Sequence, residues 1–201
     1  MQDTELGHFA VEIDSEKFTL TPSFRSMAKL ANASDLLLIF RVMHSKEALA
    51  CTLVTTAREI MLACSDKPKE LDKYLINMPS RKPHIKSSSA ISAQDQVVVA
   101  AALMRHGVAG VNRPKTGLKA GGTAMTEFNV YKHVADAKQH FGLSIDEAWD
   151  LTMSEFCYHL ASAFPPESAG QTPPSIDAHK AAMEADKEAY EKAMASQQGV
   201  K

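Results

Sequence analysis

Residues 142–164, GLSIDEAWDLTMSEFCYHLASAF, carry the clearest folding signals of the chain. Ser144 is followed three residues later by Glu147, a spacing that predicts a capping box at the start of a helix. Thr152 and Glu155 repeat the pattern, so the stretch predicts either two short helices or one bent helix. Beyond the second box, apolar side chains four residues apart share one helical face, at Phe156, Leu160 and Phe164.

The single tryptophan of the chain, Trp149, lies inside this stretch. In a protein with only 6% aromatic residues, a tryptophan usually anchors a core or an interface. We expect Trp149, Phe156 and Leu160 to belong to the core. The alternative is that Trp149 and Phe156 form part of a partner-binding face.

Towards the N-terminus, residues 9–20 alternate between apolar and polar side chains, which is typical of a small β-hairpin. We place its turn at residues 14–17. Thr21 and Pro22 then predict a helix start, with Thr21 as the N-cap and Pro22 at the first helical position. The apolar positions of the hairpin are Phe9, Val11, Ile13, Phe18 and Leu20.

Most of the remaining chain shows helical patterns. The segment after Ser34 is apolar enough to be buried as a whole helix, and residues 46–64 form an amphipathic one. Ser92 caps a helix that Gly107 ends, and the helix over 126–141 presents an apolar side. That side comprises Phe128, Tyr131, Val134, Ala135 and Lys138.

Composition also marks the boundaries between segments. Residues 79–89 form a basic connection rich in Pro and Ser, and residues 107–122 form a glycine-rich loop. Residues 165–175 are a Pro-rich linker, and residues 176–201 a charged C-terminal helix whose larger apolar residues are Met183, Tyr190 and Met194. The fold class is therefore mainly α. We expect a helical domain over residues 1–164 with a short N-terminal β-hairpin, followed by a projecting C-terminal helix.

The overall composition favours a cytoplasmic protein. The chain has 201 residues, 45% of them hydrophobic, and a net charge of -2, which argues against a nucleic-acid binder. No stretch approaches the roughly 18 apolar residues of a membrane span, and the N-terminus lacks the layout of a signal peptide. Cys51, Cys64 and Cys157 are odd in number and far apart, so we expect reduced thiols in the core.

No motif in the chain indicates catalysis or metal binding. His133 and His140 are seven residues apart, which is about 10 Å along a helix, too far for one ion. The glycine-rich loop lacks the order of a phosphate-binding P-loop. Carboxylates such as Asp146 and Asp150 fall where they oppose the positive end of a helix dipole. We therefore expect no cofactor, no metal and no enzymatic activity.

Three segments resemble tail assembly chaperones of long-tailed bacteriophages and gene transfer agents. Residues 11–30, VEIDSEKFTLTPSFRSMAKL, resemble the opening of those proteins, in which a hairpin leads through an LxPSF-type junction into a helix. Residues 102–110, ALMRHGVAG, and residues 140–156, HFGLSIDEAWDLTMSEF, are also similar to that family. The junction residues in this chain are Leu20, Pro22, Ser23 and Phe24.

The resemblance implies a protein that works in the cytoplasm of the infected bacterium and is not retained in the mature virion. Such proteins bind the tape measure protein and help tail tube subunits assemble around it. The basic middle of the chain and its acidic ends are also compatible with a homo-oligomer. We expect partner binding to involve Trp149, Phe156, Met183, Tyr190 and Met194.

Two other functions remain open at this point. One is a small structural tail or connector protein of the virion. The other is a DNA-binding regulator that uses residues 92–107 and 126–141 as a helix-turn-helix. The long loop between those segments disfavours the regulator, because that motif needs a turn of about 3–4 residues.

Overall fold

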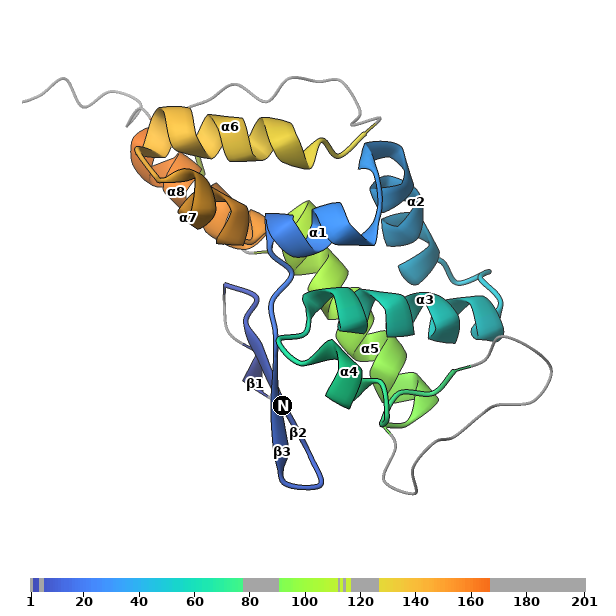
Figure 1. Cartoon of the computed structure of the whole chain (residues 1–201). Helices are drawn as coiled ribbons and strands as arrows, with labels where there is room; N and C mark the ends of the chain where they lie inside the picture. The colour runs from blue at the N-terminus through green and yellow to red at the C-terminus, as the bar shows by residue number, and fades with distance from the viewer. Residues whose placement is uncertain are drawn as a thin grey trace, which may run out of the picture. The chain divides into compact units, whose positions relative to one another are not determined.

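The computed structural model describes residues 2–3, 6–77, 91–111, 113, 115–116 and 127–166 (Figure 1). These residues belong to a compact unit, Met1–Pro166. The basic connection over 79–89, most of the glycine-rich loop and residues 167–201 lie outside the described residues. The predicted C-terminal helix, with Met183, Tyr190 and Met194, therefore lies outside them too. Within the described part the chain is mainly α-helical with an N-terminal β-hairpin, as predicted.

The hairpin consists of β2 (Phe9–Ile13) and β3 (Glu16–Leu20), paired antiparallel, with the two-residue strand β1 (Gln2–Asp3) on the other edge of β2. Ile13 pairs with Glu16, so the turn is shorter than the predicted 14–17. It contains only Asp14 and Ser15, both with positive φ, of 50° and 67°. Two such residues match the right-handed twist of the strands, which explains the tight turn.

Helix α1 (Phe24–Leu30) begins two residues later than predicted. Ser23, not Thr21, is its N-cap, because the Ser23 side chain accepts a hydrogen bond from the backbone N–H of Ser26. Thr21 still belongs to extended chain, and its N–H donates to the carbonyl oxygen of Cys64. Pro22 therefore precedes the helix.

Helices α2 (Ala33–Met43) and α3 (Ala50–Cys64) come next, followed by the short α4 (Pro68–Leu71). The prediction of a wholly buried α2 is wrong, because only one side of it packs and Leu38 is 60% exposed. Helix α3 starts at Ala50 rather than Lys46. Its core-facing stripe is Val54, Ala57, Ile60, Met61 and Cys64.

Helix α5 (Ala93–Met104) is capped by Ser92 as predicted, but Gly107 does not end it. The chain widens into one π-helical turn, η1 (Arg105–Ala109), and Gly110 with φ 73° ends the element. Gly107 brings the backbone of η1 against the start of α1. A Cβ on it would lie 2.9 Å from Sδ of Met27 and 3.0 Å from Cβ of Pro22.

The stretch 142–164 forms two helices, α7 (Ile145–Asp150) and α8 (Met153–Ala163), each with the predicted capping box. Leu151 between them is extended, and its carbonyl oxygen accepts a hydrogen bond from the N–H of Phe24. The bend therefore joins α7 and α8 to the start of α1.

The preceding helix, α6 (Val130–Phe141), begins at Val130, not at Thr126, with Asn129 as its N-cap. Its buried residues are Val130, Val134 and Ala137. The predicted apolar side was partly wrong, because Tyr131, Ala135 and Lys138 are exposed.

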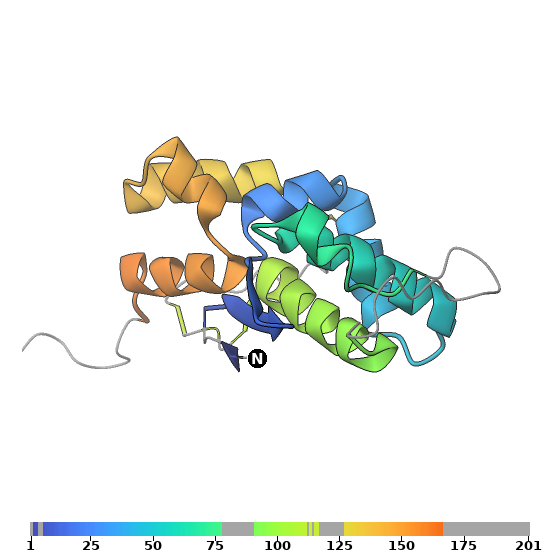
Figure 2. The same ribbon diagram turned by 60° about the horizontal axis from the view of Figure 1, so that its bottom comes forward.

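The core joins the hairpin β2–β3 to the helices of the described residues. Figure 2 shows α3 and α5 running side by side, and their packing is the most extensive between helices of the unit. The hairpin contributes its buried side, where the ring of Phe9 contacts His106 of η1 and that of Phe18 contacts Tyr74 after α4. Among the helices of the described residues, none is long and apolar enough to cross a membrane.

The three cysteines carry free thiols. Cys64 and Cys157 are buried, and burial raises the pKa of both thiols, so they remain uncharged. Cys51 is exposed, contrary to the expectation of a core position, because it lies on the first turn of α3 away from the buried stripe.

Candidate protein-binding surface

Three apolar side chains reach the surface together where α6 meets α7. Tyr131 is 70% exposed and Ile145 is 49% exposed, while Trp149 is partly buried. The rings of Tyr131 and Trp149 meet edge to face, with centroids 5.4 Å apart and planes at 90°. We call Tyr131, Ile145 and Trp149 the aromatic patch.

Local sequence signals determine where the chain turns between α6 and α7. Gly142 ends α6 in the left-handed conformation, with φ 70°, and Ser144 then starts α7. Ala148 is fully buried, so α7 contacts the core through this residue. Ile145 and Trp149 stand four apart and consequently share the side of α7 next to Tyr131.

The exposed side of α7 is acidic. The Arg25 guanidinium on α1 donates from Nε to Asp150, at 2.8 Å, and from Nη2 to Asp146, at 3.2 Å. The two carboxylates nevertheless remain 65% and 83% exposed. Hydrogen bonds from the hydroxyl and the backbone N–H of Ser144 lower the pKa of Glu147, so Glu147 stays ionised at neutral pH.

A pocket of about 320 Å³ adjoins the patch, because Tyr131 belongs to both. It lies between the junction of α1 with α2 and the first turn of α6, and we call it the α6 pocket. Phe128 at its base is fully buried. Its lining residues are Ala28, Ala31, Asn32, Ala33, Phe128, Asn129, Val130 and Tyr131.

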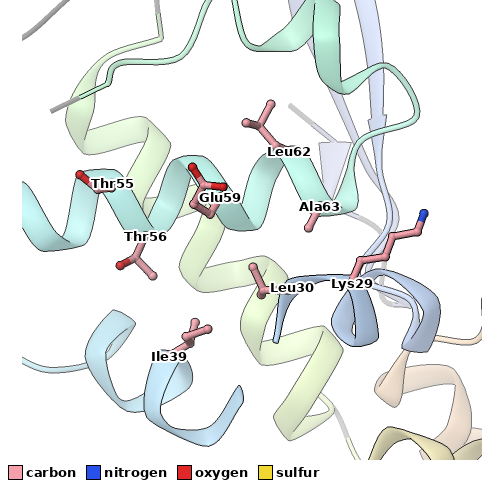
Figure 3. A pocket seen from close by; sticks show the side chains of 8 residues that line it. All are labelled: Lys29, Leu30, Ile39, Thr55, Thr56, Glu59, Leu62 and Ala63. Atoms are coloured by element: carbon pink, nitrogen blue, oxygen red, sulfur yellow. The ribbon is translucent and has the colours of Figure 1, made fainter. Parts of the chain in front are cut away.

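A second concavity, the α3 groove, lies between α1, α2 and α3 and has a volume of about 500 Å³ (Figure 3). In Figure 3, Ile39 of α2 and Thr56 of α3 face the same gap, and Leu30 of α1 lies beside them. The groove is lined by apolar side chains, by the hydroxyl groups of two threonines and by one charge of each sign. Its lining residues are Lys29, Leu30, Ile39, Thr55, Thr56, Glu59, Leu62 and Ala63.

The structure separates the two site residues that were predicted in this region. Trp149 lies in the aromatic patch. Phe156 is only 4% exposed and packs in the core, where its ring contacts those of Phe24, His133 and Phe141. It therefore belongs to the core and offers almost no surface to a partner.

Sequence reasoning did not assign Tyr131 or Ile145 to this site. A signal for Tyr131 existed, because Val130, Val134 and Ala137 have the spacing of one buried stripe and leave Tyr131 beside it. Nothing in the sequence indicated which helix its ring would meet.

A buried pair of His106 and Ser154 joins η1 to α8. Nδ1 of His106 lies 2.9 Å from the Ser154 hydroxyl oxygen, which also accepts a hydrogen bond from the N–H of Val111. The two side chains are 3% and 0% exposed, so a substrate has no access to the hydroxyl. Within the described residues, no group of three His, Cys, Asp or Glu side chains could hold a metal ion.

Comparison with known proteins gives one match. The model of the family described as "Family of unknown function (DUF6246)" matches residues 33–191. The match begins at the first residue of α2 and includes every later element, so the aromatic patch falls within it. No curated protein and no solved structure matches the chain.

Proposed function

This chain belongs to DUF6246, a family of unknown function, and we propose that it is a phage tail assembly chaperone. In this role it binds the tape measure protein and promotes assembly of tail tube subunits around it. The resemblance of residues 11–30, 102–110 and 140–156 to tail assembly chaperones supports the proposal. The action is non-enzymatic and takes place in the cytoplasm of the infected bacterium, before the virion matures.

The observation that carries the proposal is the aromatic patch. Tyrosine and tryptophan side chains contribute strongly to protein interfaces, because they bury a large area while fixing few torsion angles. Tyr131 and Trp149 contact each other, and Ile145 extends their apolar surface along α7. The α6 pocket beside them can receive a side chain of the partner.

A long client favours repeated use of such a surface. Several copies of the chain bound along one tape measure protein would each cover a stretch of apolar client surface. Binding to a shared client also raises the effective concentration of neighbouring copies. A modest affinity per copy is therefore enough to keep the client soluble.

Co-expression tests the proposal. The chain is produced together with the tape measure protein of the same phage, a long protein, and the soluble fraction is purified through a tag on the chain. We expect more of the long protein in solution, in a complex that contains several copies of the chain. The variant Tyr131→Ala/Trp149→Ala should lose the complex, whereas Leu38→Ala, which alters an exposed apolar residue of α2, should retain it.

If the tape measure protein stays insoluble and does not co-purify with the chain, the proposal is contradicted. The alternative function is that of a structural tail or connector protein. Such a protein would be found in purified virions, whereas a chaperone would be absent from them. No specific observation favours the DNA-binding alternative. Helix α5 packs chiefly on α3, and α6 packs on α7 and α8, so the two do not form a compact helix-turn-helix.

A further inference from the structure

The surface around the aromatic patch is made of two helices, α6 and α7, whose backbone groups are already hydrogen-bonded. At the two helix starts, side chains of Asn129 and Ser144 accept hydrogen bonds from backbone N–H groups. The surface therefore offers no free strand edge to which an extended peptide could add. A partner segment gains no backbone hydrogen bonds here, and an α-helix needs none, because its own backbone groups bond to each other.

The shape of the patch agrees with a helical partner. Ile145 and Trp149 are one helical turn apart, about 6 Å along the axis of α7, and form an apolar ridge. Such a ridge fits between the side chains of a second helix that repeats apolar residues every three or four positions. Tyr131 stands at the end of this ridge beside the α6 pocket, which has room for one further side chain.

The charges that α7 carries beside the ridge are negative, although α6 also presents the exposed Lys132 and Lys138. Asp146 and Asp150 lie on α7 next to Ile145 and Trp149, and they share one cation, Arg25. Both carboxylates keep most of their surface in solvent, so a second cation can reach them. A Lys or Arg side chain of the partner would gain from these carboxylates.

We propose that the aromatic patch binds an amphipathic α-helix whose apolar stripe is flanked by Lys or Arg side chains. The apolar residues of this helix cover Tyr131, Ile145 and Trp149, and its cations face Asp146 and Asp150. The inference rests on the proposed function where it names the client, because the helix is then a basic amphipathic segment of the tape measure protein. An acidic helix with the same apolar stripe binds this site more weakly, because its carboxylates repel those of Asp146 and Asp150.

Two synthetic peptides test the chemistry directly. Each is an amphipathic helix of about 20 residues, roughly 30 Å long. Their Leu stripes are identical, and the flanking positions are all Lys in one peptide and all Glu in the other. Fluorescence anisotropy with the full chain should show about tenfold tighter binding of the Lys peptide, the effect of two exposed ion pairs. The preference should shrink as salt is raised.

Charge reversal provides the matched comparison. The variant Asp146→Lys/Asp150→Lys should bind the Glu peptide better than the Lys peptide. The control Glu47→Lys/Glu70→Lys makes the same change in net charge at exposed acids outside α6 and α7, and it should keep the original preference. Ile145→Ala/Trp149→Ala should weaken both peptides, and thermal melts show whether each variant is folded. Equal binding of the two peptides, or a preference that the reversal leaves unchanged, overturns the inference.

The same variants in the co-expression experiment separate the two proposals. If Tyr131→Ala/Trp149→Ala loses the tape measure protein and Asp146→Lys/Asp150→Lys retains it fully, the charge inference is wrong and the chaperone function stands. If the wild-type chain retains no tape measure protein, the chaperone function is wrong. The peptide titrations then decide by themselves whether the patch selects basic helices.

Discussion

Thr152 ties the N-terminal segment to the bend between α7 and α8. Its Oγ1 accepts a hydrogen bond from the backbone N–H of Glu155, at 3.1 Å, and donates one to the carbonyl oxygen of Leu6, at 2.7 Å. The side chain is fully buried. Its loss would therefore leave a helix N–H and a loop carbonyl without their partner.

We expect Thr152→Ala to lower the free energy of unfolding by about 1–3 kcal/mol, from the lost cap and the lost buried hydrogen bond. Thr152→Ser retains the hydroxyl and should lose much less. Urea denaturation of the three proteins measures the difference. Equal losses for the two variants would show that the methyl group, not the hydroxyl, matters.

His133 is a titratable group that packs among aromatic rings of the core. Its ring stacks on Phe24 and lies near Phe128 and Phe156, with centroid distances between 5.0 and 5.7 Å. Its Nδ1 is buried without a hydrogen-bond partner among the described residues. Burial lowers the pKa of His133 below its ordinary value of 6.5. Smaller effects come from Asp136, which raises this pKa, and from Lys132 and Arg113, which lower it.

Because the folded state disfavours the protonated ring, His133 contributes stability that is complete above pH 6.5. This contribution falls as the pH drops from 6.5 towards the lowered folded-state pKa. We expect His133→Phe to remove this part of the acid sensitivity, whereas the control His140→Phe, at an exposed position, should keep it. Unfolding free energies measured between pH 8 and pH 5 check the difference. Parallel pH profiles for the wild type and His133→Phe would contradict the account.

At the scale of elements, local signals were sufficient where a helix begins with a reciprocal capping box. The boxes of Ser144 with Glu147 and of Thr152 with Glu155 could be predicted, because each depends on residues three apart. The start of α1 could not be assigned from local signals alone. Thr21 and Ser23 are both good N-caps, and the bond from Thr21 to the end of α3 decides between them.

The π turn of η1 was also beyond sequence reasoning, since a glycine after an apolar helix ordinarily ends it. Here Gly107 continues the helix, because its backbone packs against Pro22 and Met27. We expect Gly107→Ala to destabilise the protein by about 1–3 kcal/mol, through displacement of η1 from α1. Chemical denaturation measures this loss. An unchanged midpoint would mean that the contact relaxes at no cost.

At the scale of the whole molecule, the candidate site was only partly predictable. Trp149 could be singled out by its rarity. Its neighbour Tyr131 could not, because their contact joins residues from different helices. The core position expected for Phe156 is confirmed, because the rings of Phe24 from α1 and His133 from α6 contact it and it is only 4% exposed. Amphipathic periodicity indicates which side of a helix is apolar, but not whether the core or a partner covers that side.

The partial burial of Trp149 separates its contribution to folding from its contribution to binding. Full removal of a buried tryptophan costs about 3–5 kcal/mol, so Trp149→Ala should lose only about 1–2 kcal/mol. We therefore expect a folded variant with a modestly lower melting temperature and no client binding. A thermal melt paired with a pull-down measures both. A variant that unfolds outright would assign Trp149 to the core instead.

Hydroxyl-radical footprinting of the chain in its complex with the tape measure protein tests the central claim most directly. Aromatic side chains report their own exposure by the rate at which they are oxidised. We predict that oxidation of Tyr131 and Trp149 falls several-fold on complex formation, while that of the α3 groove residues Leu30, Ile39 and Leu62 is unchanged. Protection of the groove with undiminished oxidation of Tyr131 and Trp149 would contradict the account.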